Sequence, residues 1–159
     1  MAVANAISEW KDKAIELVLG QDEIMELLEM DEVEADDPVY TRIFPYNHIP
    51  QTIEESKVYL TFTVNVPKIT FNKVWAYPRL TIRVIAHQDR MKLDLAGVSA
   101  TRIDYISQLI VSLITKTDFG FGKLQLATNY EDLYNYIFHY RELVFIGEEL
   151  VDNYCEEED

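Results

Sequence analysis

The chain has 159 residues, of which 48% are hydrophobic and 26% charged, a composition typical of a globular domain rather than of a disordered or fibrous protein. Apolar runs are short and charged side chains interrupt the first nineteen residues, so we expect neither a membrane-spanning helix nor a secretory signal. The single cysteine, Cys155, allows no internal disulfide and indicates synthesis in a reducing cell interior. We expect one domain over 1–159.

The net charge of −14 is concentrated in two acidic blocks. Residues 21–37 hold nine Asp or Glu and residues 148–159 hold seven, and neither block contains Lys or Arg. The part between them, 38–147, carries 12 basic and 9 acidic groups, a net of +3. Such blocks are usually solvated faces or tails, and otherwise they contact basic partners. Binding to nucleic-acid phosphates requires clustered Lys and Arg, so we do not expect it.

Two helices and a loop are predicted before the first strand. Over 3–19, apolar residues recur at spacings of three and four, which indicates an amphipathic helix. A short second helix follows, with Asp22 and Glu23 in its first turn, where the helix dipole favours negative charge. The acidic stretch Asp31–Asp37 is predicted to be an exposed loop that ends at Pro38.

Two strands are predicted from apolar residues that alternate with polar ones, over Lys57–Val66 and Arg79–His87. The segment between the strands, Pro67–Pro78, is too long for a tight turn. It has two lysines, no acidic residue and three aromatic residues, so we expect a hairpin or loop arm that takes part in assembly.

The second half of the chain is predicted to contain one long helix and two strands. A polar connection, 89–97, leads to a helix over Thr101–Lys116 that Ser99 or Thr101 can cap. Strands are expected at Lys123–Ala127 and Glu142–Ile146. The predicted fold class is α+β: a small mixed or antiparallel sheet packed by the N-terminal helix and the long central helix, with the extended arm.

The sequence contains no recognisable catalytic or metal-binding frame. His48, His87 and His139 lack the spacing of metal ligands, and Cys155 lies in the acidic tail. The segment Gly120–Lys123 lacks the frame of a phosphate loop, and no nucleophile motif is present. We therefore expect no enzymatic activity, no catalytic residues, no metal and no cofactor.

Aromatic residues are more numerous than one core of this size requires, with ten tyrosines and seven phenylalanines. They crowd into 40–46 and 130–140. One interpretation is partial burial in the core. The other is a set of subunit interfaces, where aromatic side chains are enriched.

The order of these segments resembles the tail-terminator and neck subunits of tailed bacteriophages. Its most distinctive local element is the Arg102-x-Asp104 turn that opens the long helix, although Asp104 also suits a first helical turn and Arg102 could simply be exposed. The acidic C-terminal block is not part of the resemblance. The matching segments, in chain order, are the N-terminal helix, Ile43–Pro50, Tyr59–Val66, Leu80–His87, Gly97, Arg102–Ile106 and Glu142–Ile146.

The resemblance implies a virion structural protein, made in the host cytoplasm. It would form a ring, hexameric in the family, at the head-proximal end of the tail, and would contact tail tube and sheath proteins and the head-side connector or adaptor. The alternatives are a head-closure or baseplate component, or a small ligand-binding or regulatory domain. We expect no contact with a membrane or with a specific nucleic-acid sequence.

The acidic blocks suggest two arrangements in such a ring. They could face basic residues of a neighbouring copy, or they could line a central channel and repel DNA. Our candidate interface residues are Phe71, Trp75, Tyr77, Arg79, Arg83, Arg90, Lys92, Arg102, Asp104, Tyr134 and Tyr136.

Overall fold

The computed structural model describes residues 3–50, 52, 54–66, 75–119, 123–147 and 149–150. The helices are α1 (Val3–Leu19), α2 (Asp22–Leu27), α3 (Glu32–Asp36) and α4 (Arg102–Lys116), with a 3-10 turn at Gln88–Arg90. The strands are β1 (Ile43–Phe44), β2 (Val58–Asn65), β3 (Trp75–Ala76), β4 (Arg79–His87), β5 (Gln125–Leu133), β6 (Phe138–Ile146) and β7 (Glu149–Leu150).

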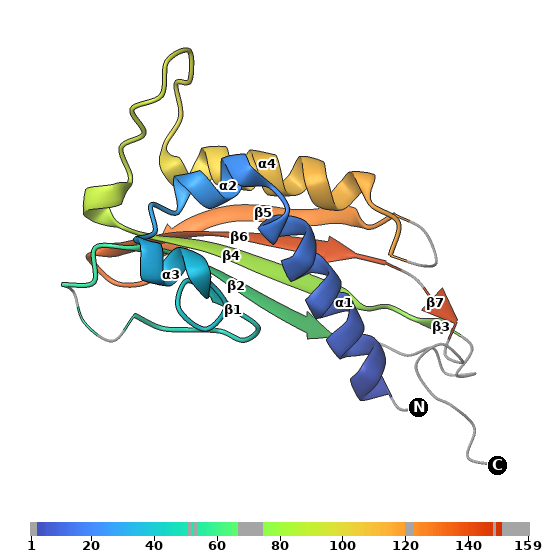
Figure 1. The fold of residues 1–159 in the computed structure, drawn as a ribbon. Helices are drawn as coiled ribbons and strands as arrows, with labels where there is room; N and C mark the ends of the chain where they lie inside the picture. The colour runs from blue at the N-terminus through green and yellow to red at the C-terminus, as the bar shows by residue number, and fades with distance from the viewer. Residues whose placement is uncertain are drawn as a thin grey trace.

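Five strands form a mixed sheet in the order β1-β2-β4-β6-β5. Strand β1 runs parallel to β2, and the other neighbours are antiparallel. Helices α1, α2 and α4 cover one face of this sheet, with α4 lying along it and α1 crossing it (Figure 1). The predicted α+β class, with a sheet packed by an N-terminal and a central helix, is confirmed.

The main core lies between the helices and the sheet. In α4, Ile103, Ile106, Ile110 and Ile114 recur at spacings of three and four, and all four are fully buried. Their spacing places them on one face of the helix, where they meet the apolar side chains of the central strands. The sheet and α1 supply further fully buried side chains, among them Ala14, Val18, Leu60, Phe62, Leu80, Ile82, Val84, Leu143 and Phe145.

The opposite face of the sheet is also buried at one end. Phe44, Tyr59, Ile85 and Phe138 form a second apolar cluster there, although alternation placed Tyr59 and Ile85 on the more polar side. Half-buried aromatic residues of the β5–β6 hairpin pack against the cluster. The strands are therefore half-buried only along part of their length.

The acidic stretch 31–37 is not an open loop, and this prediction was wrong. Residues 32–36 form α3, which begins with a capping box: Glu34 N donates to Asp31 Oδ1 at 2.8 Å, and Asp31 N donates to Glu34 Oε1 at 3.4 Å. The pair satisfies two amide groups that the start of a helix leaves without partners. The spacing Asp-x-x-Glu in the sequence was the signal for it.

The C-terminal hairpin is longer than predicted. Strand β5 runs to Leu133 and β6 begins at Phe138, whereas strands were expected only over 123–127 and 142–146. In this hairpin β6 is a central strand and β5 is an edge strand. The crowd of tyrosines in 130–140 therefore belongs to two paired strands and their turn.

The predicted arm, Pro67–Pro78, is described only in its last four residues. Residues 67–74, including Phe71, lie outside the described residues. Trp75 and Ala76 form β3, which pairs with Leu150 and Glu149 of β7. Among the described residues, a segment that projects from the body is 91–100, which we call the projecting loop; it is the yellow-green loop between β4 and α4 in Figure 1.

Candidate assembly surfaces

The projecting loop is held at its base by Arg102, the first residue of α4. The backbone N–H of Arg102 donates to Met91 O at 2.9 Å, and its Nε donates to Arg90 O at 2.7 Å. The hydroxyl of Thr101 accepts from the backbone N–H of Asp104 and caps the helix, as predicted. The loop therefore leaves and rejoins the body at a fixed point.

Arg102 also binds the carboxylate of Glu29. Its Nη2 lies 2.6 Å from Glu29 Oε1, and Arg90 Nη1 lies 2.6 Å from Glu29 Oε2. Arg102 Nη1 donates to Leu27 O at 3.0 Å. Arg102 is only 7% exposed, so the alternative in which it is simply exposed is wrong, and little of its surface is left for a partner. These contacts of Arg90 and Arg102 hold the projecting loop against the end of α2.

The tip of the projecting loop is an ordered turn. Val98 N donates to Leu95 O at 3.1 Å, and Gly97 has a φ of 80°, as the third residue of a type II turn does. A Cβ atom at Gly97 would meet nothing within 4 Å, so the tip stands in open space. Leu95 is 43% exposed there.

An aromatic surface lies on the sheet face that the three helices leave uncovered. The ring of Tyr140 contacts the rings of Tyr130 and Tyr134 edge to face, with centroids 6.3 and 5.5 Å apart. Arg83 lies over the Tyr140 ring and pairs with Glu142 at 3.0 Å. The hydrogen bond with Tyr140 raises the pKa of Tyr130 to about 12, so Tyr130 stays protonated at neutral pH.

The basic candidates fall into two groups. Arg83 and Arg90 are already paired with Glu142 and Glu29 of the same chain. Arg79 and Lys92 are exposed, and within the described ranges neither makes an ion pair. These two have charge available for a neighbouring copy.

The other candidates are scattered over the molecule. Asp104 pairs with Arg141, whose Nη2 is 2.8 Å from Asp104 Oδ1, and so ties α4 to β6. Tyr136 is 72% exposed at the β5–β6 turn. Tyr77 is half-buried before β4, and only the backbone of Trp75 is described. Of the described candidates, Arg90 and Arg102 share Glu29, and Arg83 and Tyr134 both contact Tyr140, but these two groups do not form one site.

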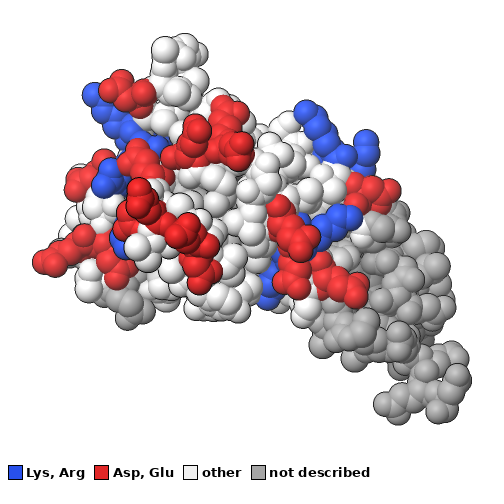
Figure 2. All heavy atoms as spheres, in the orientation of Figure 1, with Lys and Arg blue, Asp and Glu red and all other residues white. Residues whose placement is uncertain are grey.

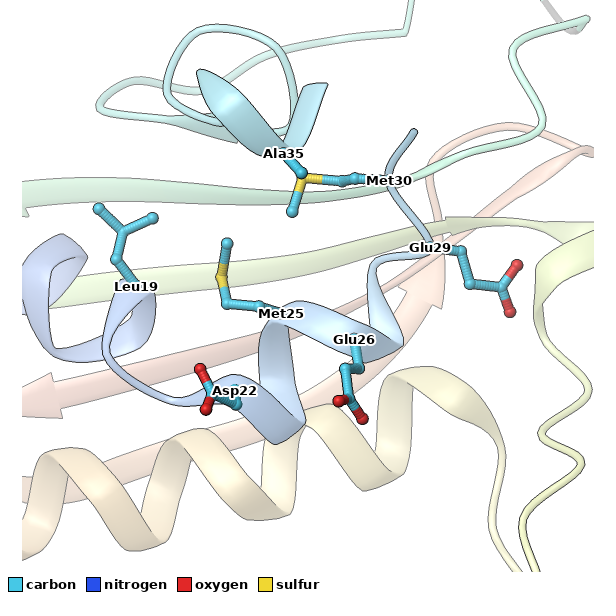
Figure 3. A pocket seen from close by; sticks show the side chains of 7 residues that line it. All are labelled: Leu19, Asp22, Met25, Glu26, Glu29, Met30 and Ala35. Carbon is cyan, nitrogen blue, oxygen red and sulfur yellow. The ribbon is translucent and has the colours of Figure 1, made fainter. Parts of the chain in front are cut away.

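An acidic groove lies between the end of α1, α2 and α3 (Figure 3). Its volume is about 580 Å³. Its lining is partly apolar and partly acidic. The apolar residues are Leu19, Met25, Met30 and Ala35, and the acidic residues are Asp22, Glu26 and Glu29. Figure 2 shows acidic side chains gathered on the side of the molecule where α2 and α3 lie.

Sequence analysis missed the role of Arg42, which is 3% exposed. Its guanidinium makes a two-pronged contact with Glu34, at 2.6 and 3.1 Å, and donates to the carbonyls of Leu28, Glu29 and Val58. Burial by itself raises the pKa of Glu34. The hydrogen bond and the charge of Arg42 lower this pKa by more than burial raises it, so the net pKa lies below the ordinary value. Part of the acidic block is therefore internal structure.

His48 and His87 lie at the second apolar cluster. His48 stacks on Phe44 with ring centroids 3.9 Å apart, and burial lowers the pKa of His48. His87 packs edge to face on Phe138, and its Nδ1 accepts from the backbone N–H of Asp89. Within the described residues, no three His, Cys, Asp or Glu side chains are grouped so that they could hold a metal ion. No described helix is long and apolar enough to cross a membrane.

These features define a small α+β protein with helices on one face of a mixed five-stranded sheet. The family model YomW matches residues 12–146, and the chain belongs to this phage-related family. A chain from the virion of a native gene transfer agent particle is similar with a TM-score of 0.44 and 16% identity, over 80% of this chain and 91% of that one. No curated protein matches the chain significantly.

Proposed function

We propose that this protein is a structural component of a phage-type virion. In our proposal it acts like a tail terminator: copies form a ring, hexameric as in the family that the sequence resembles, at the head-proximal end of the tail. The ring joins the tail tube to the head-side connector. The observation that carries this proposal is membership of the phage-related YomW family over residues 12–146.

Two features of the surface support an assembly role. In a ring each subunit contacts its neighbours through two different patches, because head-to-tail contacts are heterologous. The projecting loop and the aromatic surface are separate features of the molecule, and each presents side chains suited to an interface. Strand β5 is an exposed edge strand of nine residues, and such edges are templates for pairing with another chain.

We propose no enzymatic activity. Four of the six charged side chains that sequence analysis selected are engaged in structural ion pairs: Arg83 with Glu142, Arg90 and Arg102 with Glu29, and Asp104 with Arg141. These contacts hold segments of the fold together.

The test is self-association combined with location in particles. Size-exclusion chromatography with light scattering should give a closed oligomer, and negative-stain electron microscopy should show rings. Antibody labelling of purified particles should mark the junction of head and tail. A chain that stays monomeric at every concentration, fails to bind tail-tube protein and is missing from particles would contradict the proposal.

Labelling also decides between positions in the particle. Label inside the head end of the connector would favour a head-closure protein, and label at the far end of the tail would favour a baseplate component.

The acidic groove is the observation that favours the ligand-binding alternative. A ligand-dependent rise in melting temperature in a strictly monomeric protein would support that alternative instead.

A further inference from the structure

We propose that the projecting loop of one copy docks in the acidic groove of a second copy. This inference rests on the proposed function, since it names the contact that joins neighbouring subunits. Both surfaces belong to described residues, and they lie on different parts of the same molecule, the loop at 91–100 and the groove between α1, α2 and α3.

The projecting loop has the properties of an assembly element. Its tip carries the exposed apolar residues Leu95 and Ala96 and stands away from the body (Figure 1), whereas Met91 and Leu93 at its base pack against the main core. A loop of this composition is more stable when its apolar side chains are covered. The turn at its tip and the anchoring at its base fix its shape, so little conformational entropy is lost when it binds.

The groove offers a complementary surface. Leu19, Met25 and Met30 supply apolar area, and methionine side chains adapt to the shape of an inserted group. Asp22 and Glu26 are exposed at the groove, whereas Glu29 is engaged by Arg90 and Arg102 of its own chain. The groove therefore favours a ligand that is apolar and carries a positive charge beside its apolar group.

The loop meets this requirement through Leu95 and Lys92. Lys92 is its only cation, is exposed and makes no ion pair within the described part of the chain. Docking would place Leu95 on the methionines and Lys92 beside Asp22 or Glu26, and would leave Asp94 in solvent. Because the loop and the groove are different surfaces, the contact is heterologous and repeats from copy to copy until a ring closes.

The first experiment measures self-association of purified full-length variants by light scattering and sedimentation. Leu95→Asp should weaken association about tenfold or more, as the loss of a central apolar anchor does. Ile49→Asp is the control, because Ile49 is 57% exposed and lies outside the projecting loop, the acidic groove and β5, and it should have little effect. Lys92→Glu should also weaken association, and Glu26→Lys combined with it should restore association.

The second experiment is disulfide crosslinking in a Cys155→Ser background. One copy carries Ala96→Cys in the loop, and another carries Ala35→Cys at the groove. Mixing them under mild oxidation should give a covalent dimer of the two, and Leu133→Cys in place of Ala35→Cys should give none. Normal rings from Leu95→Asp without this crosslink would overturn the inference and leave the proposed ring intact. A wild-type chain that never self-associates would overturn both.

Discussion

Arg102 at the start of α4 and Glu29 just after α2 are joined by a 2.6 Å ion pair. Glu29 has a φ of 50°, and its second carboxylate oxygen binds Arg90 at the base of the projecting loop. The same carboxylate lines the acidic groove. One side chain therefore sets the position of the loop relative to the groove.

Replacing Glu29 tests this clamp. Glu29→Gln leaves Arg102 without its charged partner and should lower the free energy of unfolding by about 1–3 kcal/mol. Limited proteolysis should cut the projecting loop faster in this variant, because Arg90 and Arg102 are held less firmly. Glu26→Gln, at an exposed position near the end of α2, should change stability by less than about 0.5 kcal/mol. Equal stability of the two variants would show that the clamp contributes nothing.

The buried guanidinium of Arg42 should contribute more to the free energy of unfolding than an exposed guanidinium does. Arg42→Ala leaves Glu34 and several carbonyls without a donor, and should cost about 3–5 kcal/mol of stability in urea unfolding. Arg42→Lys keeps the charge but loses the forked geometry, so its cost should lie between that of Arg42→Ala and zero. Arg79→Ala, at an exposed arginine, serves as the control and should be nearly neutral. A neutral Arg42→Ala would contradict the assignment.

The lowered pKa of Glu34 predicts a pH dependence of stability. A carboxyl whose pKa falls on folding stabilises the protein at pH values above the ordinary pKa of the carboxyl, 4.5. This stability is lost as the pH falls through the lower pKa of the folded state. The difference in unfolding free energy between wild type and Glu34→Gln should thus be large at neutral pH and shrink below about pH 4. A difference independent of pH would contradict the ion pair with Arg42.

Gly97 should tolerate alanine less well than Gly20 does. At Gly97 the φ of 80° strains any residue with a Cβ. Gly97→Ala should therefore lower the free energy of unfolding by about 1 kcal/mol or less and loosen the loop tip. At Gly20 the added Cβ would make ordinary contacts of 3.5 and 3.6 Å with carbonyl oxygens, and Gly20→Ala should be neutral or slightly stabilising. Thermal unfolding and amide exchange at residues 95–98 measure both.

Salt dependence distinguishes two roles for the acidic C-terminal block. If it faces Arg79 or Lys92 of a neighbour, deleting Glu156–Asp159 should weaken assembly and flatten its dependence on ionic strength. Unchanged assembly at every salt concentration would leave channel lining or solubility as its role. The N-terminal block is less suitable for this test, because Asp31 caps α3 and Glu34 binds Arg42.

Local patterns in the sequence predict the main elements of the fold. The spacing of Ile103, Ile106, Ile110 and Ile114 predicts α4, and Thr101 marks its start. The alternation in 79–87 predicts β4 with its observed bounds. These predictions succeed because a helix face or a strand face depends on residues three, four or two positions apart. The Asp31-x-x-Glu34 pattern also specifies α3, and it was present in the sequence although we predicted a loop.

Local patterns do not predict which segments meet and which stand apart. Arg102, Glu29 and Arg90 come from three separate segments, and no local pattern indicates that one carboxylate serves both arginines. Tyr59 and Ile85 are buried on the second face because other segments cover it, which periodicity does not encode. The projecting loop is 91–100 because ion pairs and packing hold its two ends side by side. Such contacts depend on how distant segments pack, and so they appear only once the whole chain is folded.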